Sequence, residues 1–296
     1  MKNKFEYATE LGHHRFSVRN SRLGISGTIT PLADYRAQVE LSNEGKFQVL
    51  DLSGTLNLCE GLSLTLGQTS IPIFNSYTTH PGTMMFANRT FLAKYYAGTR
   101  DIGFLAKYTS DKLAIPVCAE LGIFNGNVIN DPVWNHKLSY AARLSFGTMK
   151  GFRSTVKIYG YPKNDNENYL LYGADVRYES DNWKAESEIM RRDDKINRAD
   201  LTSGYIEGAY CIPLEGKLFK SIIPAARWDA IDRINDNKLD VHRITTGLGF
   251  GLTKKKFSSL LRINYEWYFV NHELDFLQDT QEMDANKLSV ELVYMF

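Results

Sequence analysis

Long hydrophobic runs are missing from this 296-residue sequence. No stretch of about eighteen or more apolar residues occurs, which excludes a membrane-spanning helix. The absence does not exclude a transmembrane β-barrel, because each barrel strand needs only about 9 to 11 residues and only alternate ones face lipid. The mean hydropathy of -0.32 therefore does not distinguish a soluble protein from a barrel.

Cysteine is scarce, and neither sign of charge dominates. The three cysteines, Cys59, Cys118 and Cys211, are far apart and form no Cys-x-x-Cys motif, so neither a disulfide framework nor a zinc site is expected. With 35 Lys and Arg against 34 Asp and Glu, the formal charge is +1. The chain thus lacks the positive field that drives non-specific nucleic-acid binding, and we expect no nucleic-acid partner.

Sequence motifs for catalysis are also missing. The chain contains no Gly-x-Ser-x-Gly, His-Glu-x-x-His or Gly-rich phosphate-binding motif. His13 and His14 are adjacent, and His136, His242 and His272 stand apart, without carboxylates at the spacing of a metal site. We therefore expect neither an enzyme nor a bound metal ion or other cofactor.

Aromatic residues, by contrast, are abundant. They make up 12% of the chain, with 17 Tyr and 16 Phe, a composition that favours strands over helices. In residues 287–296 apolar and polar side chains alternate, so that Leu288 and Leu292 fall on one face and Lys287 and Glu291 on the other. This period of two is typical of a half-buried strand, and it recurs along the whole chain.

The alternation predicts sixteen strands within a single domain, residues 1–296. They lie near residues 2–10, 14–30, 33–43, 46–59, 62–73, 99–110, 115–126, 136–149, 152–163, 168–180, 183–195, 201–213, 220–232, 242–254, 258–272 and 286–296. Within 14–30, Phe16 and Val18 are out of step with Leu23 and Ile25, which indicates a bulge in this strand.

The connections between these strands fall into two sets. Those near Leu32, Glu60, Lys150, Asp181 and Lys255 are tight turns, whereas the intervening connections are longer and polar. Outer-membrane barrels have an even number of antiparallel strands, short periplasmic turns and longer external loops. The sequence therefore predicts an all-β fold, a transmembrane antiparallel β-barrel of sixteen strands in the outer membrane of a Gram-negative bacterium.

The beginning of the chain bears on this location. Residues 1–10, MKNKFEYATE, contain lysines but no apolar core and no small-residue cleavage site, so they are not a secretory signal. An outer-membrane location therefore requires that a signal peptide has been removed from this chain.

One connection is much longer than the others. It joins the fifth and sixth predicted strands over residues 74–98, where a hairpin needs only about 2 to 5 residues. Tyr77, Phe86 and Tyr96 make it too apolar for a loop in water. We expect it to fold into the lumen as the third external loop and to form a constriction, with an external lid as the alternative.

Five stretches of the chain together resemble the phosphate-selective porin O/P family of outer-membrane channels. They are RFSVRNSRLGISG (15–27), LGQTSIPIF (66–74), NRTFLAKYYAGTRDIGF (88–104), ARWD (226–229) and TGLGFGLTKKKFSSLLRINYEW (246–267). They are similar to that family's Arg-rich second strand, its Gly-Gln-x-x-x-Pro segment, its Arg loop followed by Arg-Asp-x-Gly, its Arg-aromatic-Asp strand and its closing Gly hairpin. The resemblance covers essentially the whole chain.

The resemblance implies a sixteen-stranded, usually trimeric barrel whose third external loop narrows the pore. Its function would be passive diffusion of small polar or anionic solutes, phosphate among them. Its partners would be outer-membrane lipid, these solutes, and further copies of the chain in a homotrimer or other components of a membrane complex. One departure favours a general or mildly anion-preferring pore over a phosphate-specific one: the expected lumen face mixes signs, as with Arg262 and Glu266.

Cations are the candidate functional residues. Arg89 and Arg100 flank the expected constriction, with Lys94 beside them, and guanidinium groups in a narrow pore would attract anions and offer bidentate sites for phosphate or carboxylates. The alternative is that Arg100 and Asp101 anchor the loop to the wall through ion pairing. The alternation places further cations on the pore lining, namely Arg19, Arg22, Arg36, Lys107, Arg143, Arg153, Lys157, Arg227 and Arg262. These cations would either set a positive field or simply pair with carboxylates on neighbouring strands.

Outward-facing aromatic residues are the second set of candidates. Trp and Tyr rings settle at the two membrane–water interfaces, and a terminal aromatic resembles the end that barrel-assembly machinery recognises in this class. The predicted membrane-interface residues are Trp183, Trp228, Trp267, Tyr294 and Phe296.

Two functions from different classes remain. The first is a passive diffusion channel for small polar or anionic solutes. The second is a barrel plugged by its own third loop, which serves as a structural partner in an outer-membrane protein complex. A soluble ligand-binding β-protein is disfavoured, because sixteen strands with aromatic outer faces would expose too much apolar surface to water. An open lumen would distinguish the first function from the second.

Overall fold

The structure is a computed structural model of the 296-residue chain. It describes residues 1–75, 79–96, 99–126, 129–132, 134–162, 168–196, 200–233, 239–272, 274, 283 and 285–295. The expected constriction, residues 74–98, is therefore described except for 76–78 and 97–98, and Phe296 lies outside the described residues.

The described residues form one sheet of eighteen strands. In chain order the strands are β1 (Lys2–Ala8), β2 (His13–Arg19), β3 (Arg22–Thr30), β4 (Ala33–Asn43), β5 (Lys46–Cys59), β6 (Leu62–Ser70), β7 (Arg100–Ser110), β8 (Val117–Phe124), β9 (Ser139–Gly147), β10 (Gly151–Pro162), β11 (Asn168–Glu179), β12 (Trp183–Asp194), β13 (Leu201–Tyr210), β14 (Ile212–Pro213), β15 (Ser221–Arg233), β16 (Val241–Gly251), β17 (Leu260–Val270) and β18 (Lys287–Val293). Within the described part of the chain, no helix is long and apolar enough to cross a membrane.

Side-chain alternation is what makes these segments strands. In β18 the buried positions are Lys287, Ser289, Glu291 and Val293, and the residues between them are half-buried. The same alternation in β12 buries Lys184, Glu186 and Glu188 and leaves Trp183 and Ile189 exposed. The sheet is therefore polar on its covered face and apolar on its outer face, the reverse of a water-soluble β-protein.

The count of eighteen strands corrects the sixteen expected from the alternation. The predicted strand 14–30 is divided into β2 and β3 at Asn20, whose positive φ of 52° breaks the extended backbone where the bulge was expected. The predicted strand 201–213 is divided into β13 and β14 at Cys211, whose N–H donates to the Asn182 carbonyl oxygen at 2.8 Å. The sequence prediction counted each of these interrupted strands as a single strand.

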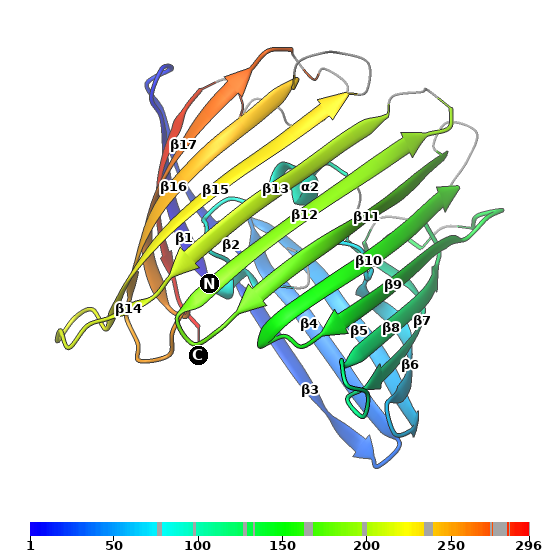
Figure 1. The fold of residues 1–296 in the computed structure, drawn as a ribbon. Helices are drawn as coiled ribbons and strands as arrows, with labels where there is room; N and C mark the ends of the chain where they lie inside the picture. Colours follow the sequence, from blue (N-terminus) through cyan, green and yellow to red (C-terminus); the bar gives the residue numbers. More distant parts are fainter. Residues whose placement is uncertain are drawn as a thin grey trace.

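Hydrogen bonding continues in both directions from β1, and every pairing is antiparallel. β1 pairs with β18 on one side and with β2 on the other. β4 pairs with β3 and then reaches β2, because the Glu44 N–H donates to the Val18 carbonyl oxygen at 3.2 Å. Each later strand pairs with the strand before it, and β9 pairs with β10. The two ends of the chain consequently lie together, with the Met1 ammonium donating to the Tyr294 carbonyl oxygen at 3.1 Å (Figure 1).

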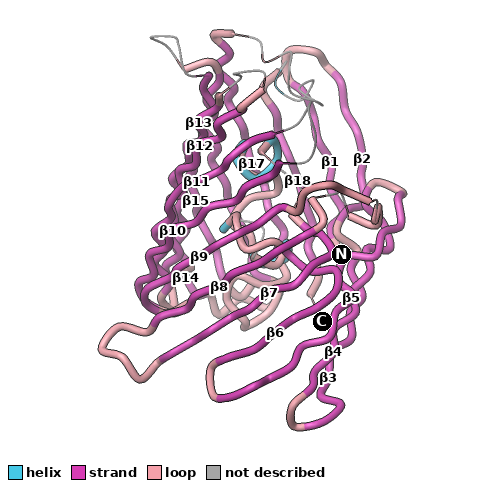
Figure 2. Tube along the Cα trace, turned by 90° about the vertical axis from the view of Figure 1, so that its right-hand side faces the viewer, coloured by secondary structure: helices cyan, strands magenta, loops and turns pink. Residues whose placement is uncertain are grey.

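The connection between β6 and β7 lies inside the curve of the sheet (Figures 1 and 2). It contains a short 3-10 turn, η1 (Pro81–Thr83), and one helical turn, α2 (Phe91–Tyr95). Its apolar side chains form the main core together with side chains from β8 to β13, β15 and β16. The core members from this connection are Ile71, Ile73, Phe74, Phe91, Leu92 and Tyr96. We call residues 71–99 the inner segment.

Candidate functional site

The beginning of the inner segment is attached to β12 by Asn75. The Asn75 backbone N–H donates to Glu188 Oε1 at 3.1 Å, and its side-chain amide donates to Glu186 Oε2 at 3.2 Å. Arg153 of β10 donates to the Asn75 amide oxygen at 2.7 Å. Beneath these contacts Lys157 pairs with Glu188 and with Asp175, all of them buried. The backbone N–H and the side-chain amide of Asn75 thus hold the segment against β10 and β12.

Apolar packing continues this attachment at α2. Thr90 caps the helix, with its hydroxyl accepting from the Ala93 N–H at 3.3 Å. Phe91 and Leu92 are fully buried, and the Tyr96 hydroxyl donates to the Met190 carbonyl oxygen of β12 at 3.1 Å. Burial raises the pKa of Tyr96, so the hydroxyl stays protonated and remains a donor.

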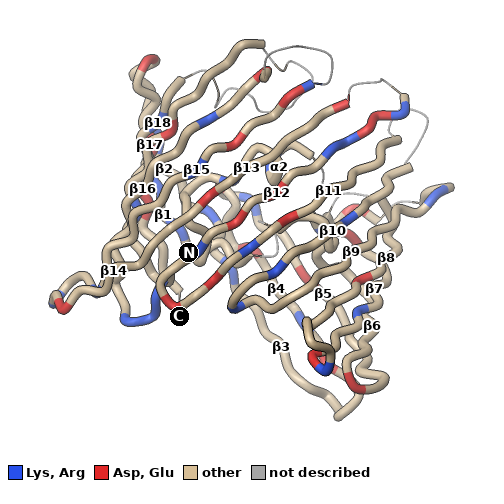
Figure 3. The backbone as a smooth tube through the Cα atoms, viewed as in Figure 1, with Lys and Arg blue, Asp and Glu red and all other residues tan. Residues whose placement is uncertain are grey.

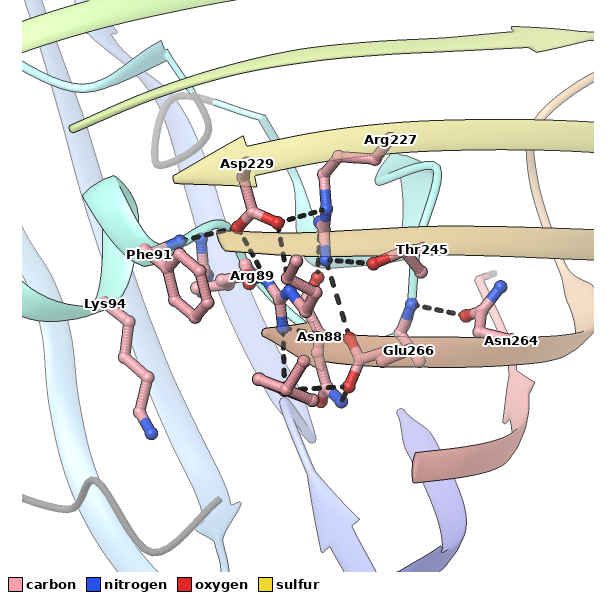
Figure 4. Close-up of polar contacts among 12 residues, drawn as sticks. Asn88, Arg89, Phe91, Lys94, Arg227, Asp229, Thr245, Asn264 and Glu266 are labelled. Carbon is pink, nitrogen blue, oxygen red and sulfur yellow. Dashed lines mark hydrogen bonds and ion pairs between the residues drawn. The ribbon is translucent and has the colours of Figure 1, made fainter. Parts of the chain in front are cut away.

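A buried ion-pair network holds the centre of the inner segment (Figure 4). Arg243 of β16 binds both carboxylate oxygens of Asp229 on β15, at 3.0 and 2.7 Å, and Glu266 of β17 at 3.0 Å. The same guanidinium donates to the Arg89 carbonyl oxygen at 2.7 Å. Asp229 also accepts from the Phe91 backbone N–H at 3.0 Å. Wall and segment therefore share one set of hydrogen bonds.

Asn88 is the second amide that ties the segment to this network. It donates to Glu266 Oε2 at 3.0 Å, accepts from Lys4 Nζ of β1 at 2.8 Å, and offers its carbonyl oxygen to Arg227 at 3.0 Å. Further along, Arg262 of β17 binds the Met84 carbonyl oxygen and pairs with Glu291 of β18. The attachment thus runs from β10 through β18 to β1.

Burial decides how strong these contacts are. The side chains of Arg227, Arg243 and Arg262 are each only 1% exposed, and their carboxylate partners are covered as well. Taking an ion out of water costs several kcal/mol, and that cost is offset only where geometry and hydrogen bonding are nearly complete. The network is therefore selective: it stabilises the one position of the segment that completes it, and removing a member leaves the buried charges that it contacts less fully compensated.

The opposite wall, β3 to β8, is open to water by comparison. Arg36 of β4 pairs with Asp51 of β5 at 2.9 Å, yet its side chain remains 54% exposed. Small hydroxyl residues line the same wall, for example Thr55 and Thr65, whose hydroxyls lie 2.9 Å apart. Lys107 of β7, the register partner of Glu120 on β8, is exposed.

The predicted lining cations divide into a buried group and an exposed group. One group is buried and paired with carboxylates or with the inner segment: Arg143, Arg153, Lys157, Arg227 and Arg262. The other group is wholly or partly exposed: Arg19, Arg22, Arg36 and Lys107. The exposed group is not free of anions, since Arg19 lies 3.4 Å from Glu44 and Arg22 lies 3.0 Å from Glu40.

The three cations predicted at the constriction also differ in how exposed they are. Arg89 is half-buried, with its carbonyl oxygen bound to Arg243. Lys94 of α2 is exposed, points away from the ion-pair network, and donates to the Tyr95 hydroxyl at 3.0 Å (Figure 4). Arg100 is 9% exposed and donates to Asp51 on β5 at 2.8 Å. Asp101, the partner considered for Arg100, accepts from the Gly126 N–H at 2.7 Å.

The predicted interface aromatics lie on the outer face wherever the structure describes them. Trp183 is 52% exposed, and the other three described residues of this set are also exposed: Trp228, Trp267 and Tyr294. Their role at a membrane surface stays a prediction. Among the described residues, no group of three or more His, Cys, Asp or Glu could hold a metal ion.

Several residues that hold the site were missed from the sequence. Arg243 shares the inward parity of Thr245 and Gly247, so the alternation could have found it. Asn75 and Asn88 carry no such signal, because they are neutral amides in an irregular segment. Lys2 and Lys4 are buried in β1. They were missed as well, although residues 2–10 were predicted to form a strand.

Comparison with known proteins identifies the fold. No protein-family model matches the sequence, and no curated protein matches it. OmpF of Salmonella typhi, in complex with daunomycin, has a TM-score of 0.69 at 12% identity, over 100% of this chain and 95% of that one. The outer-membrane channel DcaP of Acinetobacter baumannii gives 0.65 at 12%, over 100% and 95%. The anion-selective porin from Comamonas acidovorans gives 0.64 at 13%, over 98% and 95%.

Identities this low establish the fold and not the family. The resemblance to phosphate-selective O/P porins accordingly stays a prediction, since no family model supports it. What the similarity over nearly the whole length of both chains does show is that this chain has the fold of outer-membrane porins.

Proposed function

We propose that this chain is an outer-membrane porin, a passive channel for small polar and anionic solutes. The observation that carries the proposal is the contrast between exposed and buried cations on the inner face. Arg36 and Lys107 are exposed on one wall, whereas the cations of the other wall are neutralised beneath the inner segment. Water and solutes would pass between the inner segment and β3 to β8.

The proposal treats the sheet as a closed barrel in a single domain, residues 1–296. Pairing of β1 with both β18 and β2 supports closure, because hydrogen bonds then run around the sheet without an open seam at the chain ends. The eighteen described strands would form the wall of this barrel. Closure is required in lipid, where unpaired backbone groups cost several kcal/mol each.

Within this barrel the inner segment would be the constriction. Arg89, Lys94 and Arg100 would lie along it, and the exposed cations of the open wall would face it. Clustered cations in a low-dielectric passage lower the barrier for anions and raise it for cations. We infer a preference for anions as a class, phosphate included, without specificity for phosphate, because Glu44 and Asp34 remain accessible on the same wall.

Location and assembly follow from the same fold. The chain would lie in the outer membrane of a Gram-negative bacterium after removal of a signal peptide, with outer-membrane lipid around it. A homotrimer is part of the proposal, since a trimer form is recorded for the similar OmpT of Vibrio cholerae, at a TM-score of 0.63 and 9% identity. Transport would need neither catalysis nor a cofactor.

A plugged barrel that acts as a structural partner is the second candidate. It is favoured by the apolar core that the inner segment forms with the wall, including Phe74, Leu92 and Met190, each with no exposed surface. In this alternative the inner segment would close the lumen completely.

Single-channel current in a planar bilayer under a salt gradient distinguishes the two. We expect steady, voltage-independent conductance with a reversal potential of anion sign, retained when phosphate replaces chloride and reduced by Arg89→Ala. Protein that is inserted and folded, by its resistance to protease, but carries no current would overturn the channel and favour the plugged barrel.

A further inference from the structure

A shallow cavity of about 540 Å³ lies at the end of the sheet that carries the tight turns. It is formed by the β9–β10 turn and the β11–β12 turn, together with Tyr210 at the end of β13. The two turns are neighbours because Gly151 at the start of β10 pairs with Glu179 at the end of β11. The inner segment and the proposed passage contribute no residue to this cavity.

One side of the cavity is aromatic and faces outward. Tyr178 and Trp183 are 45% and 52% exposed, and the Trp183 ring packs against Tyr210 with centroids 4.6 Å apart. Rings of this kind, apolar in body and polar at one edge, are typical of the boundary between the hydrocarbon and headgroup regions of a membrane.

The other side of the cavity carries two opposite charges that are not used in the structure. Lys150 and Asp181 both line it and both are exposed, and neither side chain has a hydrogen bond or ion pair with another described residue. Glu179, the remaining carboxylate of the lining, is already paired with Arg177 at 2.9 Å and lies 3.8 Å from Lys184. The free positions are therefore one cation and one anion on adjacent turns.

The β11–β12 turn, which presents Asp181, is held in place by hydrogen bonds. The Ser180 N–H donates to the Trp183 carbonyl oxygen at 2.9 Å, and the Trp183 N–H donates to the Ser180 hydroxyl at 3.1 Å. Asn182 accepts from Lys256 Nζ at 2.6 Å and from the Cys211 N–H at 2.8 Å. A ligand would consequently bind without ordering the backbone, a cost that flexible sites have to meet.

We propose that this cavity binds the headgroup of a zwitterionic phospholipid with a primary ammonium, as in phosphatidylethanolamine. Lys150 would bind the phosphate, Asp181 would accept hydrogen bonds from the ammonium, and Tyr178, Trp183 and Tyr210 would pack against the glycerol and the upper acyl chains. The inference rests on the proposed function in one respect, since it needs this end of the sheet to lie at a membrane surface.

The charge pattern excludes other lipids as the preferred ligand. An anionic headgroup such as phosphatidylglycerol would place its phosphate near Lys150 but offer Asp181 only neutral hydroxyl donors and no positive charge to pair with. A choline headgroup carries the positive charge but has no N–H to donate to a carboxylate. The headgroup that complements both charges is the one with a phosphate and a primary ammonium.

Lipid retention by the full-length protein in detergent micelles, measured by native mass spectrometry, tests the proposal. Delipidated protein is incubated with phosphatidylethanolamine, phosphatidylcholine or phosphatidylglycerol of identical acyl chains. We expect phosphatidylethanolamine to bind about tenfold more tightly than the other two, the effect of one charge-assisted hydrogen bond. Asp181→Asn should remove this preference, and Lys150→Gln should weaken both phosphatidylethanolamine and phosphatidylglycerol.

Matched substitutions at other exposed turns provide the control. Asp111→Asn and Lys255→Gln each neutralise an exposed turn residue outside the cavity and should leave lipid preference unchanged. Equal retention of the three lipids, unaffected by Lys150→Gln or Asp181→Asn, would mean a bulk lipid annulus and would overturn the proposal. Conductance of the same preparations is read separately, so a porin without a lipid site and a lipid site on a non-conducting barrel give different results.

Discussion

The two walls of the interior carry similar charges but put them to different use. Along β10 to β18 and β1, Lys, Arg, Asp and Glu are buried beneath the inner segment and paired with one another. Along β3 to β8 the lining combines Ser, Thr and Gly with charged residues, among them the exposed Arg36 and Lys107 and the buried Glu40 and Asp51. Figure 3 shows acidic and basic residues recurring along the first wall, whereas β3 is almost free of them.

The difference shows that charge alternation in a strand does not by itself indicate a pore lining. A cation such as Arg262 follows the same inward parity as Arg36, yet its environment is a dry ion-pair network. In low dielectric such a pair stabilises one geometry, whereas in water it contributes little to stability but still acts on passing ions. We therefore expect substitutions on the covered wall to change stability and substitutions on the open wall to change ion selectivity.

Breaking the covered network should have the largest effect. Asp229→Ala removes the carboxylate that binds Arg243 and the Phe91 N–H, and leaves the buried Arg243 guanidinium with Glu266 as its remaining described carboxylate partner. We expect the free energy of unfolding to fall by about 3–5 kcal/mol. Urea titration in detergent micelles, followed by tryptophan fluorescence, measures the change.

Arg36→Ala on the open wall is the matched control for Asp229→Ala. Arg36 is solvated and Asp51 keeps Arg100 as a partner, so the loss of Arg36 should cost at most about 1 kcal/mol. Equal destabilisation by the two substitutions would contradict the distinction between the walls.

Apolar packing of the inner segment should give the next largest effect. Leu92→Ala removes a fully buried side chain of α2 and leaves a cavity, at a cost in the range of about 2–5 kcal/mol. The looser segment should also make single-channel current noisier. Thr65→Ala on the open wall loses one hydroxyl hydrogen bond, with an expected cost of about 1 kcal/mol, and should leave the noise at the wild-type level.

Ion selectivity should respond to the open wall. The double substitution Arg36→Gln and Lys107→Gln removes two exposed cations, and the anion-to-cation permeability ratio should fall by roughly two- to fivefold, or about 0.4–1 kcal/mol. Reversal potentials under a salt gradient measure the ratio. Arg191→Gln neutralises a half-exposed cation of β12 that pairs with Asp193 and Asp200, and should leave the ratio unchanged. A fall of the same size in Arg191→Gln would place the selective field elsewhere.

Strand positions and facing were predictable from the sequence because both depend on a local period of two. The alternation in 287–296 is the burial pattern of β18, and the parity break in 14–30 marks the interruption at Asn20. The sequence does not show whether such a break interrupts the strand. That depends on whether the left-handed Asn20 still forms backbone hydrogen bonds with the neighbouring strands. The strand count was wrong because of this interruption and the one at Cys211.

The alternation of side chains could not predict that the inner segment covers one wall. This covering depends on the path of the inner segment, which is fixed by the amides of Asn75 and Asn88 and by carboxylates far away in sequence. Parity could place Arg227 and Arg262 on the inner face, but it carries no information about what lies over them. The length and apolar character of the segment did indicate that it would not lie in water.

The smallest expected effect is a pH dependence at His80, where the inner segment approaches cations of the open wall. His80 Nδ1 accepts from the Gly82 N–H at 3.1 Å, and partial burial, followed by the nearby charges of Arg22 and Lys2, lowers the pKa of the imidazole. Below its unfolded pKa near 6.5 the unfolded chain takes up a proton that the folded chain resists, so stability falls with pH from about 6.5 downward and is unaffected above it. Because the ring keeps an exposed edge, the loss should be small.

Once His80 is protonated, it loses the acceptor for Gly82 and adds a positive charge near Arg22, so anion preference should rise as stability falls. Unfolding and reversal potential measured between about pH 8 and pH 5 should therefore change in opposite directions in the wild type, and less so in His80→Gln. His242→Gln, which removes a ring stacked on Phe269, controls for the loss of any histidine. If His80→Gln kept the full wild-type response to pH, the titrating group would lie outside the inner segment.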